Sequence, residues 1–224
     1  MSSETKSAAS ASNFEVDPHE HSSQSHLRAT RLVDGVRVSL TALGLLLGLT
    51  VLGTSGNTLS VYNTTSVPTN NLLPLWPDEF DLRPTVALVV GSAIVVFASI
   101  LSLITSKVPK LRSRSPVHTP VSLGAPFLGF AAAMIAMIFF YAVNSSTTVD
   151  TLQSWSCQWE SVGMDMQPYF GTLCRESKTA LYLSVILVPV EAVILSFAAY
   201  QTTLERKAVF IAQPRKQGSP VPSA

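Results

Sequence analysis

Charge is scarce in this sequence. Only 13% of its 224 residues are Asp, Glu, Lys or Arg, whereas an average soluble domain has roughly 25%, and 47% are hydrophobic. A chain that is disordered throughout has the opposite composition, with low hydrophobicity and high net charge. The net charge of +1 also lacks the positive excess of a nucleic-acid-binding protein. We therefore expect an ordered chain with no nucleic-acid partner.

Catalytic and metal-binding motifs are also lacking. The sequence contains no H-E-x-x-H, no G-x-S-x-G and no glycine-rich phosphate loop. His19, His21 and His26 lie in a polar N-terminal segment that has no cysteine, and His118 stands without a nucleophile or a second metal ligand. We therefore predict that the protein is not an enzyme and uses no cofactor or metal.

The hydrophobic residues are collected into four long runs. A bilayer core about 30 Å thick is crossed by roughly 20 apolar residues in a helix. The runs cover about 38–54, 85–105, 121–143 and 180–202. They predict an all-α integral membrane protein built as a four-helix bundle. The first run is the shortest and has two interpretations, a cleaved signal peptide or an uncleaved anchor, and the 37 residues before it favour the anchor.

The distribution of Lys and Arg predicts the orientation of the spans. Twelve of the 15 basic residues lie in the N-terminal tail, the 106–120 connection and the C-terminal tail. The 55–84 and 144–179 connections hold three basic and seven acidic residues. Because cytosolic segments are enriched in Lys and Arg, both termini are expected in the cytosol and these two connections outside. The tails 1–34 and 207–224 are expected to be disordered, around a membrane domain of 35–206.

The 144–179 connection holds both cysteines of the chain, Cys157 and Cys174. An outer loop is an oxidising environment, so we predict a disulfide between them. Four aromatic residues lie in or beside the bridged segment: Trp155, Trp159, Tyr169 and Phe170. They allow two interpretations, a structural lid packed on the protein's own helices or a surface that recognises a partner.

Both outer connections carry an N-x-S/T sequon. Asn63 and Asn144 are therefore candidate glycosylation sites, and Asn63 is the better one because Asn144 adjoins the end of the third span. In the first outer connection, four bulky apolar residues stand beside two prolines: Leu72, Leu73, Leu75 and Trp76. This composition predicts a non-helical segment at the membrane interface, where Trp is favoured.

The cytosolic connection after the second span contains four basic residues within eight positions: Lys107, Lys110, Arg112 and Arg114. Such a cluster binds anionic lipid headgroups, at about 1 kcal/mol per charge near the surface. Ser113 and Ser115 lie among these charges, and their phosphorylation would weaken the attraction. The alternative is a cluster that serves only to orient the spans.

Small and polar residues mark the faces on which the spans are expected to pack. Gly44 and Gly48 form a G-x-x-x-G pattern in the first span. Two stripes with seven-residue spacing lie in the second and fourth spans: Thr85, Ser92, Ser99 and Ser106, then Ser177, Ser184, Glu191 and Ala198. Because a seven-residue repeat favours left-handed packing near +20°, we predict that the second and fourth spans pack along these stripes.

Glu191 is the one ionisable residue inside a predicted span. Its depth places it between Ser92 and Ser99, and Pro189 is expected to kink the same helix. A charge at this depth is costly, so the side chain should face protein or water and find a partner or stay protonated. Glu191 is either a proton or cation relay or a carboxyl that ties helices together, and the lack of other intramembrane charges favours the structural role.

The combination of four spans, short outer loops and a cysteine pair among aromatic residues resembles the MARVEL and claudin-like four-span membrane proteins. The stretch WSCQWESVGMDMQPYFGTLCRESKTALYLSVILVPVE, residues 155–191, also resembles uncharacterised four-span proteins of filamentous fungi. Claudin-like and fungal cortical-patch proteins carry their Trp and Cys motif in the first outer loop, whereas this chain carries it in the second. The MARVEL resemblance implies membrane apposition, lateral organisation or vesicle traffic without catalysis.

These features predict a non-enzymatic tetraspan protein of the plasma membrane or another secretory-pathway membrane. It would organise lipids or partner proteins through its helix faces and the bridged outer loop, as a homo-oligomer or within a larger membrane complex. The alternative is a small transport or channel component, or an accessory subunit, that uses Glu191.

Overall fold

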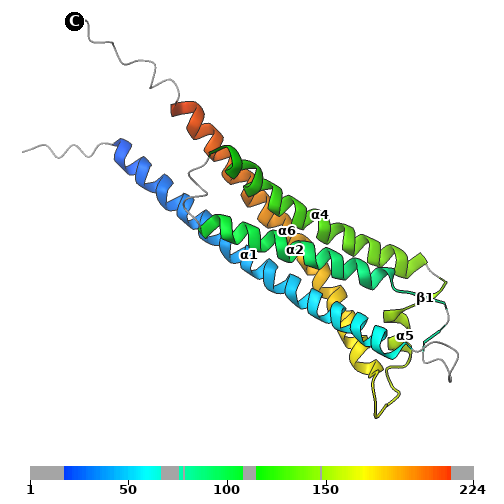
Figure 1. The fold of residues 1–224 in the computed structure, drawn as a ribbon. Helices are drawn as coiled ribbons and strands as arrows, with labels where there is room; N and C mark the ends of the chain where they lie inside the picture. Colours follow the sequence, from blue (N-terminus) through cyan, green and yellow to red (C-terminus); the bar gives the residue numbers. More distant parts are fainter. Residues whose placement is uncertain (1–17, 67–75, 78, 108–114, 147, 213–224) are drawn as a thin grey trace, which may run out of the picture. The chain divides into compact units, whose positions relative to one another are not determined.

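Four long helices make up most of the described part of the protein. Figure 1 shows how they are arranged. The computed structural model describes residues 18–66, 76–77, 79–107, 115–146 and 148–212, with the backbone alone for 18–31, 107, 115–121 and 205–212. The long helices are α1 (Pro18–Thr65), α2 (Arg83–Lys107), α4 (Ser115–Ser146) and α6 (Phe170–Ala212). The chain divides into two units, 1–35, which contains the start of α1, and 36–224, which contains the other elements.

Each long helix contains a segment that is long and apolar enough to cross a membrane. These segments are Leu32–Thr65, Arg83–Ser106, Ser122–Ser146 and Phe170–Leu204. The predicted helical class and the four apolar helices are therefore confirmed. Large apolar side chains such as Phe97 and Ile135 are exposed on these helices.

Prolines mark where the long helices begin. Pro18 is the first residue of α1, and Pro84 and Pro116 are the second residues of α2 and α4. A proline is tolerated in the first turn because the N–H that it lacks would have no intrahelical partner there. Pro168 stands two residues before the start of α6.

The helices extend beyond the hydrophobic runs. α1 continues past residue 54 to Thr65, and α6 begins at Phe170 instead of near 180. Roughly ten further residues lengthen each helix by about 15 Å, at 1.5 Å per residue. The hydropathy falls in 55–65, but no proline stands there to interrupt the helical hydrogen bonds. The predicted outer connections 55–84 and 144–179 are therefore partly helical.

Helix also enters both segments that were expected to be disordered tails. α1 begins at Pro18, inside 1–34, and α6 continues to Ala212, inside 207–224. Once a span has nucleated a helix, each further residue adds one hydrogen bond, so the helix propagates until a breaking residue. The remaining tail residues, 1–17 and 213–224, lie outside the described residues.

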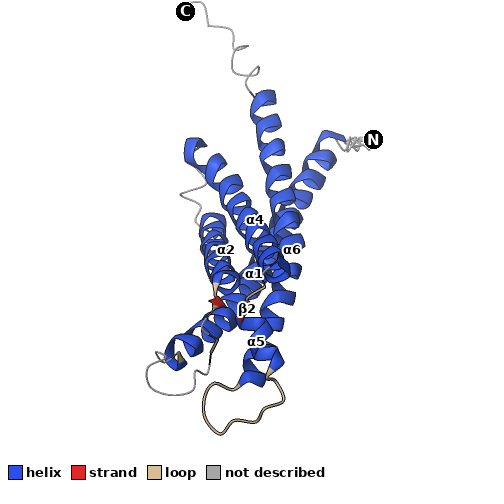
Figure 2. Cartoon of the chain, turned by 90° about the vertical axis from the view of Figure 1, so that its right-hand side faces the viewer, coloured by secondary structure: helices blue, strands red, loops and turns tan. Residues whose placement is uncertain are grey.

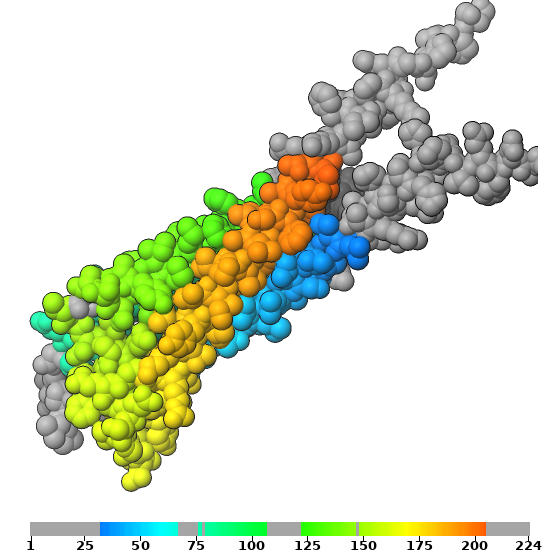
Figure 3. Space-filling view, turned by 180° about the vertical axis from the view of Figure 1, so that it is seen from behind, coloured from blue at the N-terminus to red at the C-terminus, as the bar shows by residue number. Residues whose placement is uncertain are grey.

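Within 36–224, α4 packs closely on both α2 and α6. A Cβ atom on Gly91 of α2 would stand 2.5 Å from Ala136 Cβ and 3.2 Å from the Ala132 carbonyl oxygen, so only glycine permits this approach to α4. On the other face, α6 lies between α4 and α1 (Figure 3). Among the described residues, two apolar clusters lie between the helices. Val51, Leu88, Phe140 and Leu181 belong to the first, and Val95 and Leu187 belong to the second.

The predicted packing of the second and fourth spans along their stripes is found only in part. Apart from the exposed Ser106, both stripes face the interior, and Val95 of α2 and Leu187 of α6 belong to one apolar cluster. The two helices are nevertheless not a closely packed pair, whereas α4 packs closely on each of them. The hydroxyls of Ser92 and Ser184 donate to carbonyl oxygens of their own helices, Leu88 at 2.6 Å and Leu181 at 2.7 Å. These two side chains therefore require no partner on a neighbouring helix.

A small folded region covers one end of the bundle (Figure 2). It contains α5 (Leu152–Gln158) and two short parallel strands, β1 (Phe80–Asp81) and β2 (Asp150–Thr151). Thr151 caps α5: its side chain accepts a hydrogen bond from the Ser154 N–H. We call this region the cap and define it as β1, β2, α5, the 159–169 loop and the adjoining ends of α1 and α6. The opposite end of the bundle, where Arg37, Ser122 and Gln201 lie, is called the Arg37 end.

An aromatic cluster holds the cap together. The rings of Tyr62, Trp76, Phe80 and Phe170 contact one another with centroids 5.0–5.6 Å apart. Trp76 Nε1 donates to Thr65 Oγ1 at 3.1 Å. The ring of Trp76 is thus buried among protein side chains, and the expectation that its segment rests at the membrane interface stays a prediction. Residues 67–75, which include Leu72, Leu73 and Leu75, lie outside the described residues.

Candidate functional site

The Glu191 carboxyl lies in the bundle interior, between two glycines. The residue is only 2% exposed. A Cβ atom on Gly44 of α1 would stand 3.0 Å from Oε1, and one on Gly129 of α4 would stand 2.9 Å from Oε2. Both carboxyl oxygens therefore rest against helix backbone, and any larger side chain at either glycine would displace them.

A cavity of about 10 Å³ adjoins this carboxyl. Three hydroxyl residues line it, Thr41 of α1 and Ser99 and Ser102 of α2, together with Ala98, Pro126 and Ile194. Among the described residues, Glu191 Oε1 has no hydrogen-bond partner. The interior at this level is thus polar on one side of the carboxyl.

The two sides of Glu191 along the bundle differ in chemistry. Towards the cap, the interior is closed by Val95, Ala133 and Leu187, all at least 96% buried. Towards the Arg37 end it contains the cavity and then the Arg37 side chain. Packed apolar side chains thus lie on the cap side of Glu191, and the polar cavity lies on its other side.

Arg37 links three helices at its end of the bundle. Its guanidinium donates to Gln201 Oε1 on α6 and, at 3.0 Å, to the Ser122 carbonyl oxygen on α4. That carbonyl is available because Pro126, four residues later, has no N–H to donate to it. The sequence indicated only a topogenic charge here, whereas the structure gives Arg37 a packing role as well.

The structure places some of the predicted polar and small residues beside Glu191 and others away from it. The structure brings Ser99 to the Glu191 cavity and leaves Ser92 and Ser184 outside it. Gly44 faces Glu191, whereas a Cβ on Gly48 would stand 3.2 Å from Val96 Cγ2 of α2. Gly129 was not predicted from the sequence. Its depth in the span could have indicated it, because Gly129, Gly44 and Glu191 each lie about two helical turns or more from the Arg37 end of their spans.

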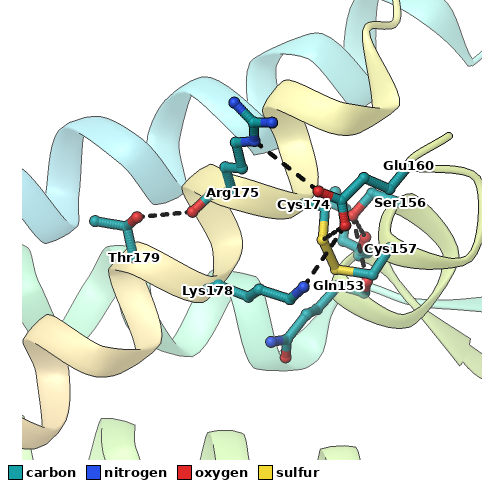
Figure 4. A network of polar contacts seen from close by, with 9 residues as sticks. Gln153, Ser156, Cys157, Glu160, Cys174, Arg175, Lys178 and Thr179 are labelled. Carbon is teal, nitrogen blue, oxygen red and sulfur yellow. Dashed lines mark hydrogen bonds and ion pairs between the residues drawn. A yellow bond between two sulfur atoms is a disulfide. The ribbon is translucent and has the colours of Figure 1, made fainter. Parts of the chain in front are cut away.

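The predicted disulfide is present and anchors α5 to α6. Cys157 and Cys174 are bonded, with their Cα atoms 4.8 Å apart. The Glu160 carboxylate lies above the bridge, with Arg175 Nε at 3.9 Å and Lys178 Nζ at 3.7 Å (Figure 4). These charges are solvent-exposed, so the ion pairs add little stability, and the covalent bond is what holds the 159–169 loop to the start of α6.

The aromatic residues around the bridge divide into two groups. Phe170 is buried and Trp155 packs against the same aromatic cluster. The tip of the loop instead exposes four large apolar side chains: Trp159 (40%), Val162 (45%), Met166 (78%) and Tyr169 (49%). We call these four residues the tip. Trp159 of the tip also contacts Trp155 of the base, with ring centroids 5.7 Å apart. The base of the loop is thus a structural lid, and the exposed surface of the tip is available to contact something else.

The remaining candidate residues lie at the ends of helices. Asn63 is exposed in the last turn of α1. Asn144 is also exposed, and its Oδ1 accepts a hydrogen bond of 2.9 Å from Thr151 Oγ1. Lys107 is the last residue of α2, and Lys110, Arg112 and Arg114 lie outside the described residues. Glycosylation and headgroup binding therefore stay predictions.

Comparison of the chain with protein-family models, with curated proteins and with solved structures found no match. The resemblance to MARVEL and claudin-like proteins and to fungal four-span proteins likewise stays a prediction. Within the described ranges, no group of three His, Cys, Asp or Glu side chains is placed to hold a metal ion.

Proposed function

We propose that this protein is a non-enzymatic tetraspan membrane protein that organises partner proteins through its cap. In this proposal both termini lie in the cytosol, and the cap lies outside a plasma membrane or another secretory-pathway membrane. The basic cluster at 107–114 would then contact anionic headgroups on the cytosolic side. The protein would act as a homo-oligomer or within a larger membrane complex.

The observation that carries the proposal is the exposed tip, which in the proposed topology lies beyond the membrane boundary. On α6, Arg175 and Lys178 are solvent-exposed and Glu176 is half-buried, and Asn57 Nδ2 of α1 donates to Glu176 at 2.9 and 3.1 Å. These polar contacts support a boundary near residues 54 and 180. The ten helical residues beyond it raise the tip by about 15 Å, whereas the headgroup layer is only about 5–8 Å thick.

The tip therefore lies beyond the headgroups of its own membrane. Apolar side chains held there by a disulfide and an aromatic cluster do not serve as an anchor in the same bilayer. An exposed apolar patch on a rigid support, surrounded by polar residues, is typical of a surface that binds another protein. This geometry favours the organising function over a purely structural lid.

Transport through Glu191 is the alternative, and the interior offers it less support. A pathway needs an opening on both sides of the carboxyl, at some stage of its cycle. The cap side is filled by Val95, Ala133 and Leu187. Proton flux in liposomes that depends on the Glu191 carboxyl would make this alternative the better one.

The proposal is tested by removing the tip without changing the fold. Trp159→Ser combined with Met166→Ser should increase lateral diffusion of the tagged protein in its native membrane and disperse its clusters. Asp165→Ser in the same loop is the matched control and should leave both unchanged. If each variant migrates like the parent protein on non-reducing gels, its disulfide has formed and the cap is folded. Equal diffusion and clustering in all three proteins would contradict the proposal.

A further inference from the structure

The Glu191 carboxyl has an unmet hydrogen-bonding requirement. Its Oε1 is buried and has no partner among the described residues. The neighbouring backbones of α1 and α4 present glycines, which offer the carboxyl space but no polar side chain. A buried carboxyl oxygen left without a donor is strongly destabilising, so a donor is expected beside it.

The cavity beside Oε1 has the size and the polar lining for one water molecule. Its volume of about 10 Å³ is close to that of one water-sized probe. A buried water typically makes about three hydrogen bonds. Ser99 and Ser102 line the cavity, and within the described part of the chain their hydroxyls make no hydrogen bond, unlike those of Ser92 and Ser184.

The charge around the cavity favours water over a cation. Among the described residues that line this cavity, Glu191 is the one charged side chain. Arg37, whose carbonyl oxygen accepts from the lining residue Thr41, lies one turn away and its positive charge repels cations. The faces of α2 and α4 that line the cavity carry only Ala, Ser and Pro, and α6 adds Ile194. On the cap side the packed side chains of Val95, Ala133 and Leu187 close the path.

We propose that one water molecule occupies this cavity and links the Glu191 carboxyl on α6 to the hydroxyls of Ser99 and Ser102 on α2. The water donates to Oε1 and exchanges hydrogen bonds with the two serines. It joins two helices that are not a closely packed pair. This site is independent of the tip and of any partner that the tip binds.

The experiment is hydroxyl-radical footprinting of the full-length protein in lipid nanodiscs, with radicals produced by X-rays from bound and bulk water. Ile194 and Leu187 form a matched pair, since both are on α6 and both are 2% exposed. Ile194 lines the cavity, whereas Leu187 packs against Val95 and Ala133. We expect Ile194 to be oxidised several-fold faster than Leu187. Equal rates would overturn the proposal.

A variant identifies the occupant. Ser102→Leu fills the cavity and should reduce Ile194 oxidation to the Leu187 rate, while the exposed tip residue Met166 stays as reactive as in the parent, which shows that the fold is kept. Ile194 oxidation that persists in the variant would contradict a water held by these serines. Replacing choline by Na⁺ or K⁺ as the cation of the buffer should leave the rate of Ile194 oxidation unchanged. A loss of Ile194 oxidation that depends on the ion would instead indicate a cation in the site.

Discussion

Replacing Gly129 by alanine tests whether the Glu191 carboxyl is held between two helices. The added Cβ would stand 2.9 Å from Oε2 and 3.4 Å from Cδ of Glu191. The backbone of Gly44 on α1 lies on the other side, close to Oε1, so the carboxyl must shift away from both glycines, towards the adjoining cavity. Such a shift takes the side chain out of its rotamer, and overpacking of this kind costs about 1–3 kcal/mol.

A matched control separates this clash from the helix propensity of alanine. Gly124→Ala makes the same change on the same helix, at a position where a Cβ would have no neighbour within 4 Å. Alanine is favoured over glycine by about 1 kcal/mol in a helix, so this control should be neutral or stabilising. We expect Gly129→Ala to be about 1–3 kcal/mol less stable than Gly124→Ala in reversible unfolding from detergent micelles.

A second substitution identifies the atom that clashes. Glu191→Ala removes the carboxyl and should recover part of the loss, giving a coupling free energy of about 0.5–3 kcal/mol with Gly129→Ala. Glu191→Gln keeps the volume and should give little recovery. The reasoning is refuted if Gly129→Ala is as stable as Gly124→Ala, or if its cost is the same with and without the Glu191 side chain.

Three further predictions concern the cap and the Arg37 end. Cys157→Ser should destabilise the cap by about 3 kcal/mol and speed proteolysis within 159–169, and an unchanged rate would mean that the bridge is not needed for order. Trp76→Ala should cost about 3–5 kcal/mol, measured by thermal unfolding, whereas Trp159→Ala should cost less than about 1 kcal/mol because its ring is half exposed. Arg37→Lys keeps the positive charge but cannot reproduce the two-sided contact of the guanidinium. It should retain the orientation of the spans in a protease-protection assay and still lower stability by about 1–3 kcal/mol; an unchanged stability would show that only the charge matters.

The sequence predicted the four apolar helices but not their ends. Hydropathy reports where a helix is expected to contact lipid, and it falls near residue 54 on α1 and near residue 180 on α6. The fall in hydropathy does not end the helix, because each further residue still adds a backbone hydrogen bond until that bonding is interrupted. Pro168 before α6 and Pro84 in the first turn of α2 were the more informative signals, since a proline restricts where a helix can begin.

The cap could be predicted only in part, for a different reason. The spacing and location of the two cysteines indicated the disulfide, which is a property of one loop. Burial of Trp76 depends on Tyr62, Phe80 and Phe170, which come from three separate segments of the chain. No local pattern shows that these segments meet, so a tryptophan beside prolines was interpreted as an interfacial residue.

The two polar stripes correctly predicted which faces of the second and fourth spans point to the interior, but not which helices pack closely. The requirements of Glu191 explain both outcomes. A leucine of similar size would fill the space between Gly44 and Gly129 without the desolvation cost of a carboxyl, so packing alone does not account for an acid here. The hydrogen-bonding groups that can satisfy Glu191 come instead from α2, the helix diagonal to it, through Ser99 and Ser102. The seven-residue stripes therefore mark two helices that face each other across a shared polar cavity, while Gly91 and Gly129 let α4 take the direct contacts with each.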